Sequence, residues 1–138
     1  MNLNKFTQKA QEAVMEAQSL AGRYNHSQIE PGHLLLALLQ QSDGIVPQVV
    51  QKLEADPREM ALSLEGELKR KPKIRGAAAQ VGMSRQLGRV LKQAEDAAQR
   101  MRDEYASTEH LLLALTSADG GEAARFLTAH GITEDAVL

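Results

Sequence analysis

The segments EPGHLLLALL (residues 30–39) and STEHLLLALT (residues 107–116) contain the same six residues, HLLLAL, in the same order. Six consecutive identities are improbable by chance in a chain of 138 residues, so the sequence predicts one structural unit that occurs twice. Both runs are apolar on every side, and helices of that kind are buried. We therefore expect two helices at the centre of the core, the first with Pro31 in its opening turn.

An amphipathic helix is predicted before each copy of HLLLAL. Apolar residues recur at steps of three and four over residues 6–24, and Thr7 or Asn4 can cap the start of this helix. A matching apolar stripe runs from Leu87 to Met101, in a helix that begins at Ser84. The order of elements is therefore the same in the two halves.

Two further helical segments are expected after each copy. Turn residues at 42–44 (SDG) and 119–121 (DGG) follow the two HLLLAL runs. In the first half, a short segment around residues 46–55 precedes a helix that starts at Asp56-Pro57 and ends near Lys69. Residues 122–138 match the register of these segments, which extends the predicted repeat to about sixty residues.

These patterns predict an all-α fold class: two pseudo-symmetric four-helix repeats packed as one domain over residues 1–138. Repeat one covers about residues 1–70 and repeat two about 84–138. Residues 71–83 (KPKIRGAAAQVGM) lose the helical periodicity and are predicted to form a linker. A single copy cannot bury its apolar stripe, and the second copy supplies the missing surface.

The composition is that of a soluble globular protein, with 43% hydrophobic and 25% charged residues. Without cysteine the chain has no disulfide and no thiolate metal ligand, which suits a reducing cytosol.

No apolar run approaches the roughly 18 residues of a membrane span, so we expect a cytoplasmic protein with no membrane partner. The net charge of -2 gives no general attraction for nucleic acid. We interpret the basic run KRKPKIR (69–75) as a solvated linker; an anion-binding site is the less favoured alternative.

The sequence contains no motif for known catalytic chemistry. It lacks a phosphate loop of the form G-x-x-x-x-G-K-[ST], a G-x-S-x-G elbow, a cysteine nucleophile and an H-E-x-x-H run. His33 and His110 open the two repeated helices, but Ala37 and Ala114 stand where a second ligand on the same face would be needed. We expect no enzyme activity and no metal; a helical enzyme that uses the two histidines remains an alternative.

Three stretches carry a family resemblance: LNKFTQKAQEAVMEAQSLA (3–21), the paired HLLLAL motifs, and RVLKQAEDAAQRMRDEY (89–105). Together they resemble the amino-terminal domain of the Clp unfoldase ATPases, most closely the ClpB disaggregase branch. The resemblance implies a mobile module that engages unfolded or aggregated polypeptide and passes it to a hexameric AAA+ ring. It also implies ATP and Mg²⁺ in ATPase modules outside this chain, no cofactor in this fragment, a cooperating chaperone of the DnaK type, and a monomeric isolated domain.

The resemblance also implies a polypeptide-binding site. The polar functional residues of the family align on Thr7, Asp103 and Glu109, and the positions of its apolar groove align on Gln93, Ala97 and His110. The groove positions depart from the family, because large aliphatic side chains would bury more apolar area than Gln, Ala or His. Either the groove is weaker here, or it has moved to neighbouring residues, namely Leu91, Ala94 or Leu111.

Each of these residues also has a purely structural interpretation. Thr7 can be a helix cap, Asp103 a solvated helix end, and Glu109 a favourable charge in a first helical turn. Two further functions remain open: an adaptor-docking domain of a protease-linked ClpC or ClpA relative, and a docking domain that binds no client.

Overall fold

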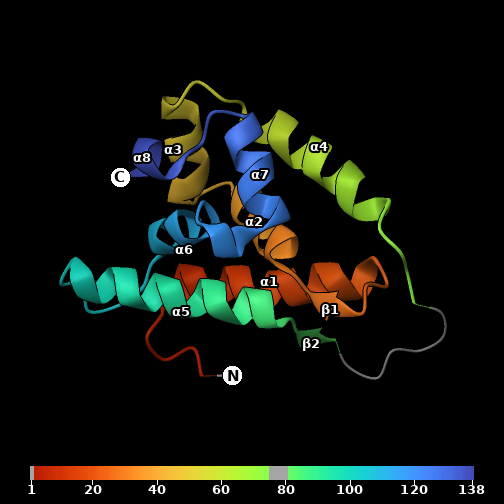
Figure 1. Ribbon diagram of the computed structural model, residues 1–138, viewed down its shortest axis with the longest axis horizontal. Coiled ribbons are helices and arrows are strands. Elements are labelled where there is room, and N and C mark those ends of the chain that lie inside the picture. The colour runs from red at the N-terminus through yellow and green to blue at the C-terminus, as the bar shows by residue number, and fades with distance from the viewer. Residues whose placement is uncertain (1, 75–80) are drawn as a thin grey trace.

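The computed structural model describes residues 2–74 and 81–138, and eight α-helices carry most of these residues (Figure 1). The elements in chain order are α1 Gln8–Arg23, β1 Gln28–Ile29, α2 Pro31–Leu39, α3 Ile45–Lys52, α4 Pro57–Lys69, β2 Gly82–Met83, α5 Arg85–Arg100, α6 Thr108–Leu115, the 3-10 turn η1 Ala118–Gly120, α7 Glu122–Ala129 and α8 Glu134–Val137. No helix in the described ranges is long and apolar enough to cross a membrane.

The helices of the second half repeat those of the first at one constant spacing. α1 begins at position 8 and α5 at position 85, which lie 77 apart. The same spacing separates the starts of α2 and α6 (31 and 108), α3 and α7 (45 and 122), and α4 and α8 (57 and 134). The prediction of two pseudo-symmetric four-helix repeats is confirmed, with α8 corresponding to the first turn of α4.

Side-chain caps begin the corresponding helices in the same way. Thr7 Oγ1 accepts the N–H of Ala10, and Ser84 Oγ accepts the N–H of Leu87, at 3.2 and 3.1 Å. Thr7 was predicted as a cap, with Asn4 as the alternative, and Ser84 as the start of its helix. Each hydroxyl satisfies an N–H group that the first helical turn leaves without an intrahelical partner.

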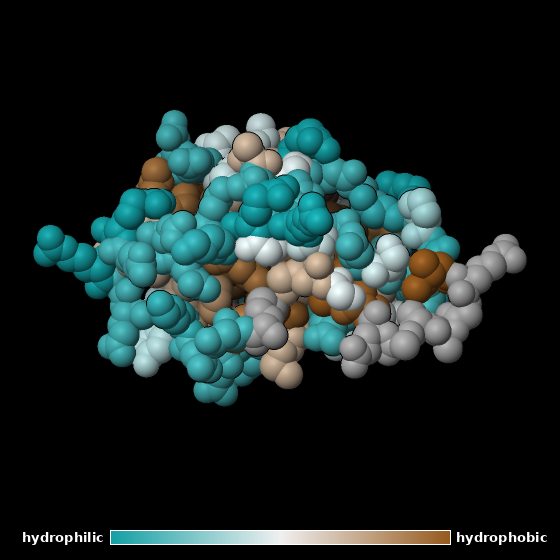
Figure 2. All heavy atoms as spheres, turned by 60° about the horizontal axis from the view of Figure 1, so that its bottom comes forward, coloured by the Kyte–Doolittle hydropathy of each residue, from teal (hydrophilic) through white to brown (hydrophobic). Residues whose placement is uncertain are grey.

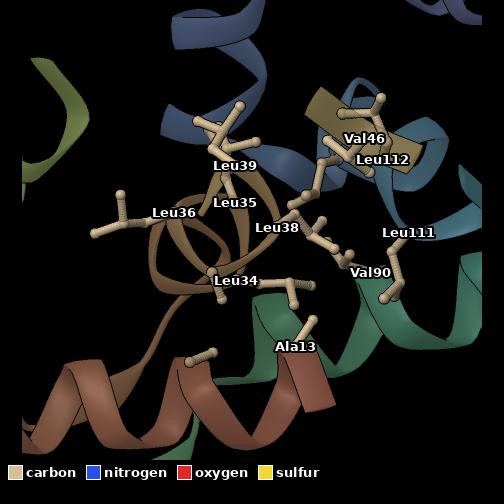
Figure 3. Close-up of a cluster of buried hydrophobic side chains, with 14 of the residues drawn as sticks. Ala13, Leu34, Leu35, Leu36, Leu38, Leu39, Val46, Val90, Leu111 and Leu112 are labelled. Carbon is tan, nitrogen blue, oxygen red and sulfur yellow. The ribbon is translucent and has the colours of Figure 1, made fainter. Parts of the chain in front are cut away.

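The two HLLLAL helices lie at the centre of one shared core. Leu34, Leu35 and Leu36 of α2 are fully buried, and α2 packs against helices of both repeats: α1 and α4 from the first, α6 and α7 from the second. In Figure 3, Leu34 points towards Ala13 of α1. Each buried leucine contributes about 1.5–3 kcal/mol relative to an exposed one, so much of the stability depends on contacts between the repeats.

Two short backbone pairings join the repeats, and the sequence pattern did not predict them. β1 and β2 are parallel, with Ile29 opposite Met83, and an isolated parallel bridge joins Phe6 to Ala106. Because Phe6 and Ala106 stand 77 positions from Met83 and Ile29, these are the same contact formed twice. β2 lies inside the predicted 71–83 linker, of which residues 75–80 fall outside the described residues.

Candidate functional site

A hollow of about 530 Å³ lies where the start of α1, the α5–α6 connection and the C-terminal residues meet. We call it the α5–α6 hollow. Four of the six residues predicted for a binding site line it, namely Thr7, Asp103, Glu109 and His110. The remaining lining residues are Val49, Met101, Glu104, Tyr105, Ser107, Leu112, Leu113, Val137 and Leu138.

The bridge between the repeats places Thr7 in this hollow. The Thr7 N–H donates to the carbonyl of Ala106 at 2.9 Å, and the Ala106 N–H donates to the carbonyl of Lys5 at 2.7 Å. These bonds hold the start of α1 beside Ser107, the residue that caps α6. Thr7 is therefore both the cap of α1 and a half-buried wall residue.

Asp103 is placed by the turn that ends α5. Arg102 has a left-handed backbone with φ of 59°, and the Asp103 N–H donates to the carbonyl of Ala98 at 2.8 Å, an arrangement that closes a helix end. One carboxylate oxygen of Asp103, Oδ2, lies 3.1 Å from Nε2 of His110.

His110 takes part in the capping of α6. The N–H of Ser107 donates to His110 Nδ1 at 2.9 Å, so the ring occupies a fixed position in the first turn. The ring is buried, whereas the side chain of Asp103 is 53% exposed. The position that the resemblance assigned to an apolar groove thus carries a polar contact.

Gln93 and Ala97 lie in a second hollow of about 460 Å³, which we call the Gln93 hollow. It adjoins the first, because Met101, Leu113 and Leu138 line both. The Gln93 side chain is held on both sides: its amide N–H donates to Asp119, and its Oε1 accepts from Ser117 Oγ at 2.8 Å. Ala97 is only 3% exposed, so it contributes almost no surface.

The neighbouring residues considered as a displaced groove are part of the core. Leu91, Ala94 and Leu111 are each at most 4% exposed. Met101, in contrast, was expected on the buried stripe of α5 but is 47% exposed, because it follows the last helical residue, where the stripe turns away from the core.

The sequence patterns did not identify the exposed apolar side chains of the α5–α6 hollow as binding residues. Tyr105 is 48% exposed, and it lines the hollow together with Met101 and the half-buried Leu113. Val49 reaches the hollow from α3 of the other repeat. On the face turned towards the viewer in Figure 2, hydrophilic side chains cover most of the surface and the apolar areas are small and separate.

The charged side chains that line the α5–α6 hollow are acidic. Asp103, Glu104 and Glu109 line it, whereas no Lys or Arg of the described chain does. An apolar floor with an acidic rim attracts segments that combine apolar and cationic side chains.

The corresponding histidine of the first repeat lies in a closed environment. His33 Nδ1 accepts the N–H of Glu30 at 2.9 Å, and His33 Nε2 lies 2.7 Å from Nδ1 of His26. Burial lowers the pKa of His33 to about 4, and burial also lowers the pKa of His26. Within residues 2–74 and 81–138, no three His, Asp or Glu side chains form a group that could hold a metal ion.

Comparison with known proteins gives one consistent result. The family model "Clp repeat (R) N-terminal domain" matches residues 5–130. The chaperone protein ClpB of Bacillus cereus is 38% identical over 141 residues, a match that covers the whole of this chain and 16% of that protein. ClpB of Nitratidesulfovibrio vulgaris is 38% identical over 118 residues, which cover 83% of this chain and 14% of that protein.

Solved structures agree in fold. The Hsp104 N-terminal domain of Candida albicans superposes with a TM-score of 0.84 at 24% identity, covering 97% of this chain and 87% of that one. The N-terminal domain of the ClpV1 ATPase from E. coli gives a TM-score of 0.81 at 26% identity, covering 98% and 82%. The chain therefore spans about a sixth of the length of the ClpB proteins and nearly all of an isolated N-terminal domain.

Proposed function

This chain belongs to the Clp repeat N-terminal domain family, and from that premise we propose that it is the substrate-engaging domain of a ClpB-like, ATP-dependent disaggregase. In this role it binds unfolded or aggregated polypeptide and passes it to AAA+ modules that lie outside the chain. The full-length protein is then a homohexameric ATPase that uses ATP and Mg²⁺ and cooperates with a chaperone of the DnaK type.

The observation that carries the proposal is the composition of the α5–α6 hollow. Two large hydrophobic residues that are about half exposed in the described chain, Met101 and Tyr105, line it. Exposed apolar side chains that gather in one hollow with a polar rim are typical of a protein-binding surface. Thr7, Asp103 and Glu109 supply the polar rim of the proposed site.

The size of the hollow suits weak binding. A space of about 530 Å³ takes only a few side chains of an extended or partly folded segment. Weak contacts serve a module that must release its client to a motor, and six copies on one ring raise the effective concentration of sites. We expect low affinity for a single domain and stronger retention of aggregates by the ring.

The proposal is tested with a fluorescently labelled, permanently unfolded polypeptide titrated with residues 1–138. Met101→Ala and Tyr105→Ala remove exposed apolar surface from the hollow and should weaken binding several-fold. Met15→Ala is the matched control, because Met15 is 63% exposed and lines none of the hollows described above. It should leave the affinity unchanged.

Two results would contradict the proposal. Equal affinity of Met101→Ala, Tyr105→Ala and Met15→Ala would remove the hollow as the binding site. Failure of the unmodified domain to bind any unfolded chain, with binding only to a folded partner protein, would instead favour an adaptor-docking domain of the ClpC or ClpA type.

A further inference from the structure

Asp103 and His110 correspond in position to His26 and His33 of the first repeat, because each pair stands 77 residues from the other. In both repeats an N–H that precedes the helix donates to Nδ1 of the histidine at 2.9 Å. In both, Nε2 of that histidine faces the residue seven positions earlier, at 2.7 Å in the first repeat and 3.1 Å in the second. The backbone setting is shared, and the contacted side chain differs.

The two pairs differ in access to solvent. α4 packs along α2 in the first repeat, where Tyr24 contacts Glu65 at 3.4 Å, and both His26 and His33 are buried. In the second repeat Asp103 lines the α5–α6 hollow with its side chain 53% exposed. The first pair is part of the interior, whereas the second presents a carboxylate to the surface.

The hydrogen bonds determine which ring nitrogen of His110 carries the proton. Nδ1 accepts the Ser107 N–H, so it holds no proton of its own. The neutral ring therefore carries its hydrogen on Nε2, the nitrogen that lies 3.1 Å from Oδ2 of Asp103. An N–H group this close to an ionised carboxylate is favourable, and the contact restrains the position of the Asp103 side chain. Among the described residues, no donor occupies the other oxygen, Oδ1.

We propose that His110 is a positioning residue of the binding site: it holds the Asp103 carboxylate so that Oδ1 takes a Lys or Arg side chain of the bound segment. This inference rests on the function proposed above. Glu104 and Glu109 add negative charge to the same hollow, and no Lys or Arg of the described chain lines it. The preferred segment is then one in which a cationic side chain stands beside aliphatic ones.

A pair of labelled, unfolded polypeptides tests the proposal: one has lysines spaced among aliphatic residues, and the other has glutamine in place of each lysine. The unmodified domain should prefer the lysine chain by about tenfold, a difference that is lost at high salt. His110→Leu should lose most of this preference. His110→Gln should retain it, because the side-chain amide can still donate an N–H to Asp103. In the Asp103→Asn background, His110→Leu should have no additional effect on the preference.

Two measurements separate positioning from a purely structural role. Urea unfolding shows whether each variant is folded at the concentrations used, and His33→Gln, the matching change in the buried pair, should alter the urea midpoint without altering the lysine preference. Nitrogen-15 NMR of the histidines should find the His110 proton on Nε2. A proton on Nδ1, or a folded His110→Leu variant with the full lysine preference, would overturn the proposal.

The failures of the two proposals are distinguishable. If the unmodified domain binds both polypeptides equally well, polypeptide binding stands and the positioning role of His110 is wrong. If it binds neither, the proposed function fails and the role of His110 fails with it.

Discussion

Thr7 and Ser84 occupy the same structural position in the two repeats. Each hydroxyl oxygen accepts the N–H three residues later, and each backbone N–H donates across the joint between the repeats, Thr7 to Ala106 at 2.9 Å and Ser84 to Ile29 at 3.0 Å. Thr7 lines the α5–α6 hollow, whereas Ser84 is buried near the other joint. A comparison of variants at Thr7 and Ser84 can therefore distinguish a role in helix capping, which both share, from a role in polypeptide binding, which only Thr7 can have.

We predict that Thr7→Ala and Ser84→Ala each lower the free energy of unfolding by about 1 kcal/mol, because each removes a cap. Urea unfolding measures this loss. Only Thr7→Ala should also weaken the binding of an unfolded polypeptide. Equal affinities of the two variants for the polypeptide would show that Thr7 is a cap and nothing more.

A second prediction concerns the repeats as folding units. Residues 1–138 should unfold in one cooperative transition as a monomer, and residues 1–75 alone should not. In the fragment, the leucines of α2 lose their contacts with α6 and α7 and are exposed to water. Circular dichroism during urea unfolding checks this; a sigmoidal transition of the fragment with full helical signal would contradict it.

A third prediction concerns acidity. The pKa of His33 is about 4 in the folded state and about 6.5 when the chain is unfolded, so between these values the unfolded state binds more protons. Stability is therefore complete above about pH 6.5 and should fall as the pH decreases towards 4. The expected slope is up to roughly 1.4 kcal/mol per pH unit for each excess proton, and His26, whose pKa is also lowered, adds to it.

Urea unfolding of the unmodified domain and of His33→Asn at several pH values tests this. The Oδ1 atom of asparagine can replace Nδ1 as the acceptor of the Glu30 N–H, so the cap persists while the titrating group is removed. The variant should show a flatter dependence of stability on pH. Identical slopes would exclude His33 as the source.

The last prediction separates two groove positions that the sequence grouped together. Gln93→Leu should tighten polypeptide binding, because it adds apolar area to the wall of the Gln93 hollow, although it also removes the contacts with Asp119 and Ser117. Ala97→Leu should instead cost about 1–3 kcal/mol of stability, because Ala97 is 3% exposed and a larger side chain must displace the atoms packed around it. A stable Ala97→Leu variant that binds more tightly would show that this position faces the client after all.

The helices could be predicted because their signal is local and periodic. Apolar steps of three and four, together with the start residues Thr7 and Ser84, placed α1 and α5, and the HLLLAL identity indicated the repeat. The backbone pairings at Ile29 and Phe6 were missed because one or two extended residues leave no periodic pattern. The contribution of Val49 to the hollow depends on how α3 packs across the repeats, which no local pattern indicates.

The contact between Asp103 and His110 was also beyond sequence reasoning, although both residues were on the candidate list. The family resemblance assigned Asp103 to the polar residues and His110 to the apolar groove. Their contact depends on the left-handed backbone of Arg102, which turns the chain back after α5 and brings Asp103 close to the first turn of α6.

The constant spacing of 77 positions has a historical meaning. If the two halves descend from one duplicated ancestor, every loop between corresponding helix starts has kept its length, since one insertion or deletion would have broken the spacing. The copies have then diverged by substitution, while the starts of corresponding helices stayed in register. At one pair of corresponding positions the result is plain: histidine at position 26 makes an interior contact, whereas aspartate at position 103 is an acid at the surface.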